Sequence, residues 1–82
     1  MKVKFNMVAI GLSLKEVEGR EGRKYYQISI DQDGEAGSMP ITEQAYLDNK
    51  GIFKKYSPCT LTCEYNDQYK TCRVLALSQG IK

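Results

Sequence analysis

The stretch from residue 2 to residue 17 constrains the fold of this chain more than any other. Polar residues at positions 2, 4 and 6 alternate with apolar residues at positions 3, 5 and 7, which is the pattern of a half-buried β-strand. From Val8 to Leu14 the even-numbered residues become the apolar set, so the pattern predicts a bulge or sharp bend near Ala9 to Gly11. A long first strand with a glycine kink can serve two parts of one sheet, as small closed barrels require.

Glycine-containing turns divide the rest of the chain into short segments. Glu18 to Gly22 is predicted to form the first turn, with Gly19 and Gly22 able to adopt positive φ. Asp33-Gly34 is a strong hairpin signal, and Thr42 is suited to cap a helix. The expected elements are strands at residues 2–17, 23–32, 38–41, 59–65 and 69–78, with one helix at residues 43–49.

This order of elements predicts an all-β fold with a small inserted helix. Residues 1–82 are expected to form a single OB-fold domain, which is a five-stranded Greek-key barrel, with the order β-β-β-α-β-β. An SH3-like barrel is the alternative, although it has no natural place for a helix between the third and fourth strands.

The composition is that of a globular protein, and its charge is unevenly distributed. Hydrophobic residues make up 41% of the chain and charged residues 27%, with a net charge of only +2. Residues 1–24 carry six cations and three acids, residues 25–49 carry five acids and no cation, and residues 50–82 carry six cations and two acids. This distribution predicts a polarised surface whose basic side comes from both ends of the chain.

The sequence argues against a membrane span and against secretion. It contains no run of about 18 apolar residues. The N-terminal stretch has two lysines and an apolar run, but Asn6 interrupts it and no small-residue cleavage site follows, so a strand is predicted instead of a signal peptide. The odd number of cysteines (Cys59, Cys63 and Cys72) fits a reducing compartment. A cytoplasmic location is therefore expected.

Metal binding and catalysis find little support in the residue types. The chain has no histidine and no fourth cysteine, so Cys59 and Cys63 lack partners for a closed zinc site and are interpreted as small buried apolar residues. Without histidine the usual general base near neutral pH is missing, and no nucleophile or phosphate-loop motif occurs. Asp31 and Asp33 face the same side of a strand end, where a solvated acidic turn is favoured over a metal site. The prediction is a non-enzyme without cofactor or metal.

A basic and aromatic stretch, residues 19–30, points to a binding function. Its loop carries three cations, and the strand that follows begins with two tyrosines. Because neighbours on a strand face opposite sides, Tyr25 is expected to point outward and Tyr26 into the core. An exposed ring beside cations suits single-stranded nucleic acid, which offers phosphates and flat bases, while the alternative is a solvated hairpin tip. The candidate binding residues of this stretch are Arg20, Arg23, Lys24, Tyr25 and Gln27.

A second loop supplies the same chemistry from a distant part of the chain. In OB-folds the ligand usually crosses strands two and three, between the loops that join strands 1–2 and 4–5. The second of these loops contributes Tyr65, Tyr69 and Lys70. Tyr65 can instead be a core ring on the inward face of the fourth strand. Lys54-Lys55-Tyr56 forms a further basic and aromatic cluster.

Several short motifs follow one another in the same order as in a known protein family. Arg20-Glu-Gly-Arg-Lys-Tyr25 resembles the R-x-G-K-x-Y loop of the filamentous-phage single-stranded-DNA-binding proteins. Gly37-x-x-Pro40 is similar to a glycine-containing turn before a proline in that family, and Tyr56-Ser-Pro58 with Thr62 is similar to its Tyr-x-Pro start of the fourth strand. Arg73 stands where the family has a basic residue. The resemblance covers nearly the whole chain.

This resemblance implies an OB-fold homodimer that coats single-stranded DNA cooperatively, without sequence specificity or cofactor. It also implies that Arg20, Arg23, Tyr25 and Arg73 contact DNA. The chain departs from the family at Met39, where the family has an aromatic residue, and at residues 64–70, where the family has a longer dimerisation loop.

Two hypotheses from different classes follow. The first is a non-sequence-specific single-stranded-DNA-binding protein in replication or transfer of a phage or mobile element. RNA remains an alternative ligand, because no residue or motif in the sequence indicates recognition of a 2′-hydroxyl. The second is a small protein-interaction module on an OB-like or SH3-like barrel. It is favoured by the low net charge, the acidic middle segment, and Glu18 and Glu21 beside the supposed DNA loop. Only the first predicts salt-sensitive binding of an oligonucleotide.

Overall fold

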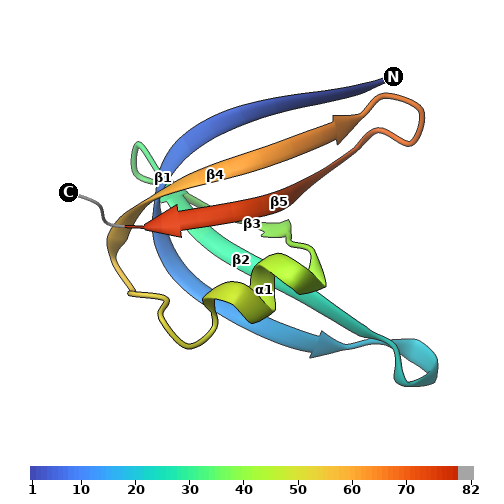
Figure 1. Cartoon of the computed structure of the whole chain (residues 1–82), viewed down its shortest axis with the longest axis horizontal. Coiled ribbons are helices and arrows are strands. Elements are labelled where there is room, and N and C mark those ends of the chain that lie inside the picture. Colours follow the sequence, from blue (N-terminus) through green and yellow to red (C-terminus); the bar gives the residue numbers. More distant parts are fainter. Residues whose placement is uncertain (80–82) are drawn as a thin grey trace.

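The computed structural model describes residues 1–79 as one five-stranded sheet and one short helix (Figure 1). The predicted mostly-β class, with a helix between the third and fourth strands, is confirmed. In chain order the elements are β1 (Lys2–Glu18), a 3₁₀ turn (Arg20–Gly22), β2 (Lys24–Gln32), β3 (Glu35–Pro40), α1 (Glu43–Asn49), β4 (Ser57–Asn66) and β5 (Thr71–Gln79).

β1 is the central strand, and two arms of the sheet share it. Residues 2–11 pair antiparallel with β4, and residues 10–18 pair antiparallel with β2, in the strand order β3-β2-β1-β4-β5. The bend in β1 turns the two arms toward each other, and α1 lies in the space between them (Figure 1). The outer strands meet where Ile41 forms a parallel bridge with Val74 and the Thr42 N–H donates to the Val74 carbonyl at 3.0 Å. We call this junction the seam.

The core lies between the arms and under α1. Tyr26 on β2 packs against Tyr46 on the helix with ring centroids 4.6 Å apart, and this contact ties α1 to the sheet. Tyr26 therefore faces inward and Tyr25 outward, as the alternation predicts. The buried apolar residues are Ala9, Ile28, Ile30, Ile41, Ala45, Cys59, Leu61, Cys63, Val74 and Leu77.

Cys59 and Cys63 are part of this core, which confirms their interpretation as small apolar residues. Burial raises the pKa of both thiols, so both are protonated at neutral pH. Cys72 is half-buried, and all three cysteines are free.

The change of phase in β1 occurs later than the sequence pattern predicts. Val8 is 62% exposed while Ala9 is buried, so the inward set continues on odd-numbered residues. The register with β2 shifts only between Gly11 and Ser13. The physical reason is that β1 stays paired with β4 as far as Gly11, and an unbroken ladder keeps its alternation. The predicted shift at Val8 is wrong, although the predicted bend lies next to the observed one.

The two glycine turns adopt different geometries from each other. In the β1–β2 turn Gly22 has φ 75, as predicted, but the other left-handed residue is Glu21 with φ 61, and Gly19 is extended at φ −100. The β2–β3 turn consists of Asp33 (φ 55) and Gly34 (φ 86), which fits a two-residue type I′ hairpin. In so short a turn the residues on either side, Gln32 and Glu35, pair directly. β3 therefore begins at Glu35, three residues earlier than predicted.

α1 begins where the sequence predicts. The Thr42 hydroxyl accepts a hydrogen bond from the Ala45 N–H at 3.2 Å, which satisfies one of the free donors of the first turn. Within residues 1–79, no helix combines the length and apolar character needed to cross a membrane.

Candidate nucleic-acid interface

Two neighbouring hollows share one arginine. The first, the seam hollow, has a volume of about 440 Å³ and lies where β3 ends and α1 begins. The second, the hairpin hollow, has a volume of about 250 Å³ and lies beside the β4–β5 turn. Arg73 lines both hollows, and we call the two together the shared surface. The seam hollow is lined by Lys24, Tyr25, Tyr26, Gln27, Pro40, Ile41, Thr42, Glu43 and Arg73, and the hairpin hollow by Lys2, Glu64, Asn66, Tyr69, Thr71 and Arg73.

Tyr25 presents its ring at the edge of the seam hollow. It is 52% exposed, and its ring lies over Gly19 so closely that a Cβ on that glycine would stand 2.9 Å from the ring Cδ2. Gly19 is therefore needed to make room for the ring, a reason that the sequence pattern did not suggest. Gln27 lies two residues further along the same outward face and lines the same hollow.

The phenol of Tyr26 lies on the other face of β2. Burial raises the pKa of Tyr26, and the charges of Glu43 and Glu16 add to the shift, so this hydroxyl stays neutral near pH 7. It can offer a hydrogen-bond donor into the seam hollow, which it also lines.

Arg73 is held in position by a buried acid. Its Nη2 lies 3.3 Å from Oε1 of Glu64 on the neighbouring strand, and Glu64 is only 8% exposed. The guanidinium itself is about half exposed, so it can still donate to a ligand. Lys4 is the register partner of Glu64 on its other side.

The three cations of the β1–β2 loop differ in what they contact. Lys24 pairs with Glu16 at 3.0 Å, and the hydrogen bond and charge of this carboxylate raise the pKa of Lys24. Lys24 lines the seam hollow, whereas Arg20 and Arg23 are exposed at the tip of the loop and line neither hollow. Among residues 1–79 these two arginines have no ion-pair partner.

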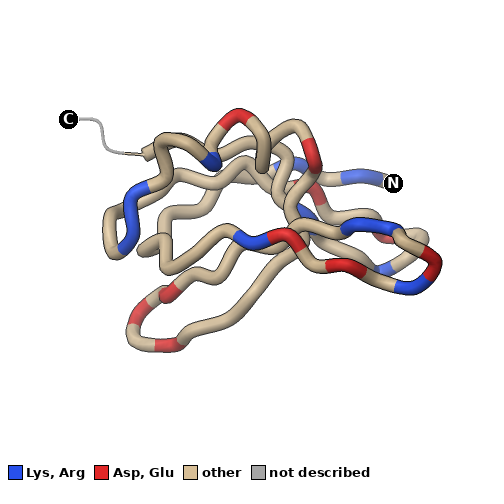
Figure 2. The backbone as a smooth tube through the Cα atoms, turned by 90° about the horizontal axis from the view of Figure 1, so that it is seen from below, with Lys and Arg blue, Asp and Glu red and all other residues tan. Residues whose placement is uncertain are grey.

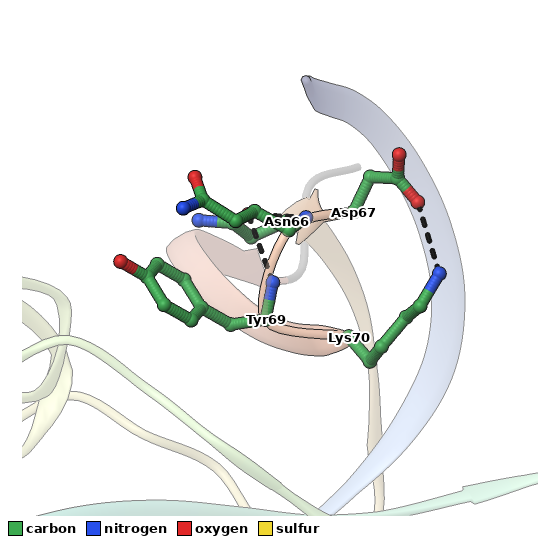
Figure 3. Close-up of polar contacts among 5 residues, drawn as sticks. Asn66, Asp67, Tyr69 and Lys70 are labelled. Atoms are coloured by element: carbon green, nitrogen blue, oxygen red, sulfur yellow. Dashed lines mark hydrogen bonds and ion pairs between the residues drawn. The ribbon is translucent and has the colours of Figure 1, made fainter.

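The β4–β5 turn separates two predicted site residues. Asn66 Oδ1 accepts from the backbone N–H groups of Gln68 at 2.9 Å and Tyr69 at 3.4 Å, which fixes the turn. The Tyr69 ring, 67% exposed, points to one side and lines the hairpin hollow, while Lys70 points to the other and pairs with Asp67 at 3.3 Å (Figure 3). Tyr69 therefore joins the shared surface and Lys70 does not.

Tyr65 also lies away from this surface. It is half-buried, pairs with Val3 and Cys72, and lies on the inward side of β4. The structure thus brings together Lys24, Tyr25, Gln27, Tyr69 and Arg73, and it leaves Arg20, Arg23, Tyr65 and Lys70 outside the two hollows.

The charges of the surface are mixed near the candidate interface and purely acidic at one distant turn. Basic and acidic residues alternate along the β1–β2 loop, whereas Asp31, Asp33 and Glu35 gather at the β2–β3 turn (Figure 2). This acidic turn lies at the opposite end of the molecule from the β1–β2 loop (Figure 1).

Lys2, Glu43 and Glu64 line the hollows without having been identified as site residues from the sequence. The alternation of β1 shows that Lys2 faces outward, but only the strand register brings it beside Asn66. Comparison with protein-family models, with curated proteins and with solved structures finds no match for this chain.

Proposed function

We propose that this chain binds single-stranded nucleic acid without sequence preference, along the surface formed by the two hollows. The observation that carries the proposal is the shared Arg73 with one exposed tyrosine on each side of it, Tyr25 and Tyr69. The two rings come from hairpins far apart in the sequence. Each ring can stack against a base of any identity. The guanidinium between the two rings can bind the phosphate that links two bases.

The proposed scaffold is an OB-fold. The order β-β-β-α-β-β supports it, as does the strand order β3-β2-β1-β4-β5 with outer strands that meet at a parallel bridge. A surface between the β1–β2 and β4–β5 loops is where OB-folds bind oligonucleotides. The resemblance to filamentous-phage proteins extends the proposal to DNA, and to replication or transfer of a phage or mobile element.

The proposed mechanism is binding without catalysis. Each stacked base contributes roughly 1–3 kcal/mol with little dependence on its identity. Lys24 and Arg73 meet phosphates while keeping contact with their own carboxylates, since ammonium and guanidinium groups each have more than one donor. Arg20 and Arg23, outside the hollows, add long-range attraction that salt screens.

Fluorescence anisotropy of a labelled oligo-dT, measured at low and moderate salt, tests the proposal. We expect salt-sensitive binding that exceeds binding to a matched duplex, and a loss of roughly fivefold or more for Tyr25→Ala and for Tyr69→Ala. Tyr56→Ala is the matched control, because Tyr56 is 76% exposed and lines neither hollow. Equal losses in all three variants would refute this site, and absent binding at low salt would refute the function. An oligo-U titration compares RNA with DNA.

The homodimer implied by the resemblance remains a prediction. Val3 and Phe5 support it, because both are about two-fifths exposed on the arm formed by β1, β4 and β5 and offer an apolar surface. Sedimentation equilibrium is the test: Val3→Ser with Phe5→Ser should convert a dimer to a monomer. A monomeric wild-type chain at high concentration would remove the dimer from the proposal.

A protein-interaction module is the second candidate, and one observation favours it. Lys24, Lys70 and Arg73 each pair with an acid of the same chain, which reduces the positive potential available to a polyanion. This candidate predicts no oligonucleotide binding at moderate salt and capture of a specific protein in a pull-down.

A further inference from the structure

Glu64 is the one charged residue that is buried within residues 1–79, and it lies directly beside the proposed phosphate contact. Its Oε1 lies 3.3 Å from Nη2 of Arg73. The charged groups that face it are Arg73 from β5 and the register partner Lys4 from β1, with Lys2 lining the same hollow. It is also the only acid among the residues that line the hairpin hollow.

A phosphate that contacts Arg73 therefore approaches a carboxylate that already occupies one of the guanidinium donors. Two anions on one cation repel each other, and the repulsion is strong here because the carboxylate is largely shielded from water. The repulsion disappears when a neutral amide of the same shape replaces the carboxylate.

We propose that Glu64 sets the affinity of the interface by competing with the nucleic-acid phosphate for Arg73. This inference rests on the proposed function and adds a regulating residue to the same site. In the free protein Glu64 holds Arg73 at the junction of the two hollows. In the complex the phosphate becomes the main partner of Arg73.

The decisive variant is Glu64→Gln, which keeps the shape of the side chain and an oxygen that accepts from Arg73 but carries no charge. Near pH 7.5 we expect it to bind oligo-dT roughly tenfold more tightly than the wild type, a change of the size expected from removing one nearby like charge. Glu35→Gln is the matched control, since Glu35 is an exposed acid of the distant β2–β3 turn.

A double-mutant cycle gives an independent readout. The increase in affinity that Glu64→Gln produces should be smaller when Arg73 is also replaced by Gln, because the competition needs the guanidinium. A purely structural role of Glu64 would leave that increase unchanged.

The possible outcomes separate this inference from the proposed function. If the wild type binds oligo-dT and a folded Glu64→Gln variant binds equally or less tightly, only the inference is overturned. If the wild type binds no oligonucleotide even at low salt, the proposed function fails and the inference fails with it. Thermal unfolding shows whether Glu64→Gln is folded; if it is not, Glu64→Met, which is uncharged and of similar size, takes its place in the same comparison.

Discussion

Replacing Gly11 with alanine tests the packing at the bend of β1. Gly11 faces the core, and a Cβ at this position would lie 2.7 Å from Cys59 Sγ and 2.8 Å from Phe53 Cζ. Favourable contacts between carbon atoms lie near 3.5–4.0 Å, so both neighbours must move. Cys59 is buried on β4, between β1 and β5, and Phe53 packs against the core, so a movement of either side chain disturbs its own neighbours.

We expect this overpacking to lower the free energy of unfolding by about 1–3 kcal/mol. For a chain of this size each kcal/mol corresponds to roughly 4–8 °C in the midpoint of thermal unfolding. Circular dichroism, followed during heating and during urea titration, measures both quantities.

Gly37→Ala is the matched control, because a Cβ there meets nothing within 4 Å and its φ is not positive. It should leave the midpoint unchanged or raise it slightly, since glycine weakens a strand through entropy. The double variant Gly11→Ala with Cys59→Ala should lose less stability than the sum of the two single variants. The reason is that the second change removes the sulfur that the new methyl group meets. An unfolding midpoint for Gly11→Ala equal to that of the control would refute the reasoning.

Three further outcomes are expected. Thr42→Ala should cost about 1 kcal/mol of stability in urea titration, because it removes the N-cap of α1; an unchanged midpoint would contradict this. The raised pKa of Cys59 and Cys63 means that the unfolded chain loses thiol protons first. Stability should therefore be constant from pH 6 to 8 and fall above about pH 8.5, and Cys→Ala changes at both positions should reduce this fall. Gly19→Ala should displace the Tyr25 ring and weaken oligo-dT binding about as much as Tyr25→Ala does. The midpoint of thermal unfolding should stay unchanged. Unaltered binding would show that the ring does not contact the ligand.

Local patterns in the sequence were sufficient to predict most of the fold. Period-2 alternation identified the strands and the faces of Tyr25 and Tyr26, and turn chemistry identified Asp33-Gly34 and the cap at Thr42. The position of the phase change in β1 was not predictable in this way, because it depends on how far the β4 ladder extends. Tertiary pairing thus overrode a local run of apolar residues.

The site was predictable only in part, because it depends on registers and backbone angles. The ladder between β4 and β5 shifts by one residue after Thr62, and this shift aligns Glu64 with Arg73 instead of Val74. Lys70 has φ 54, an unusual value for lysine that no local motif signals, and this residue turns away from the side on which Tyr69 lies.

The seam has a consequence for how the molecule opens. β3 and β5 are joined by one bridge and the Thr42–Val74 hydrogen bond, whereas the other neighbouring strands share long ladders. Partial opening there needs far less free energy than global unfolding, so the amide proton of Thr42, which is bonded across the seam, should exchange with solvent sooner than those of β1. The seam hollow spans this junction, with Gln27 on one side and Arg73 on the other. A ligand that contacts both sides of the seam stabilises its closed state and must slow the exchange of the seam amide proton.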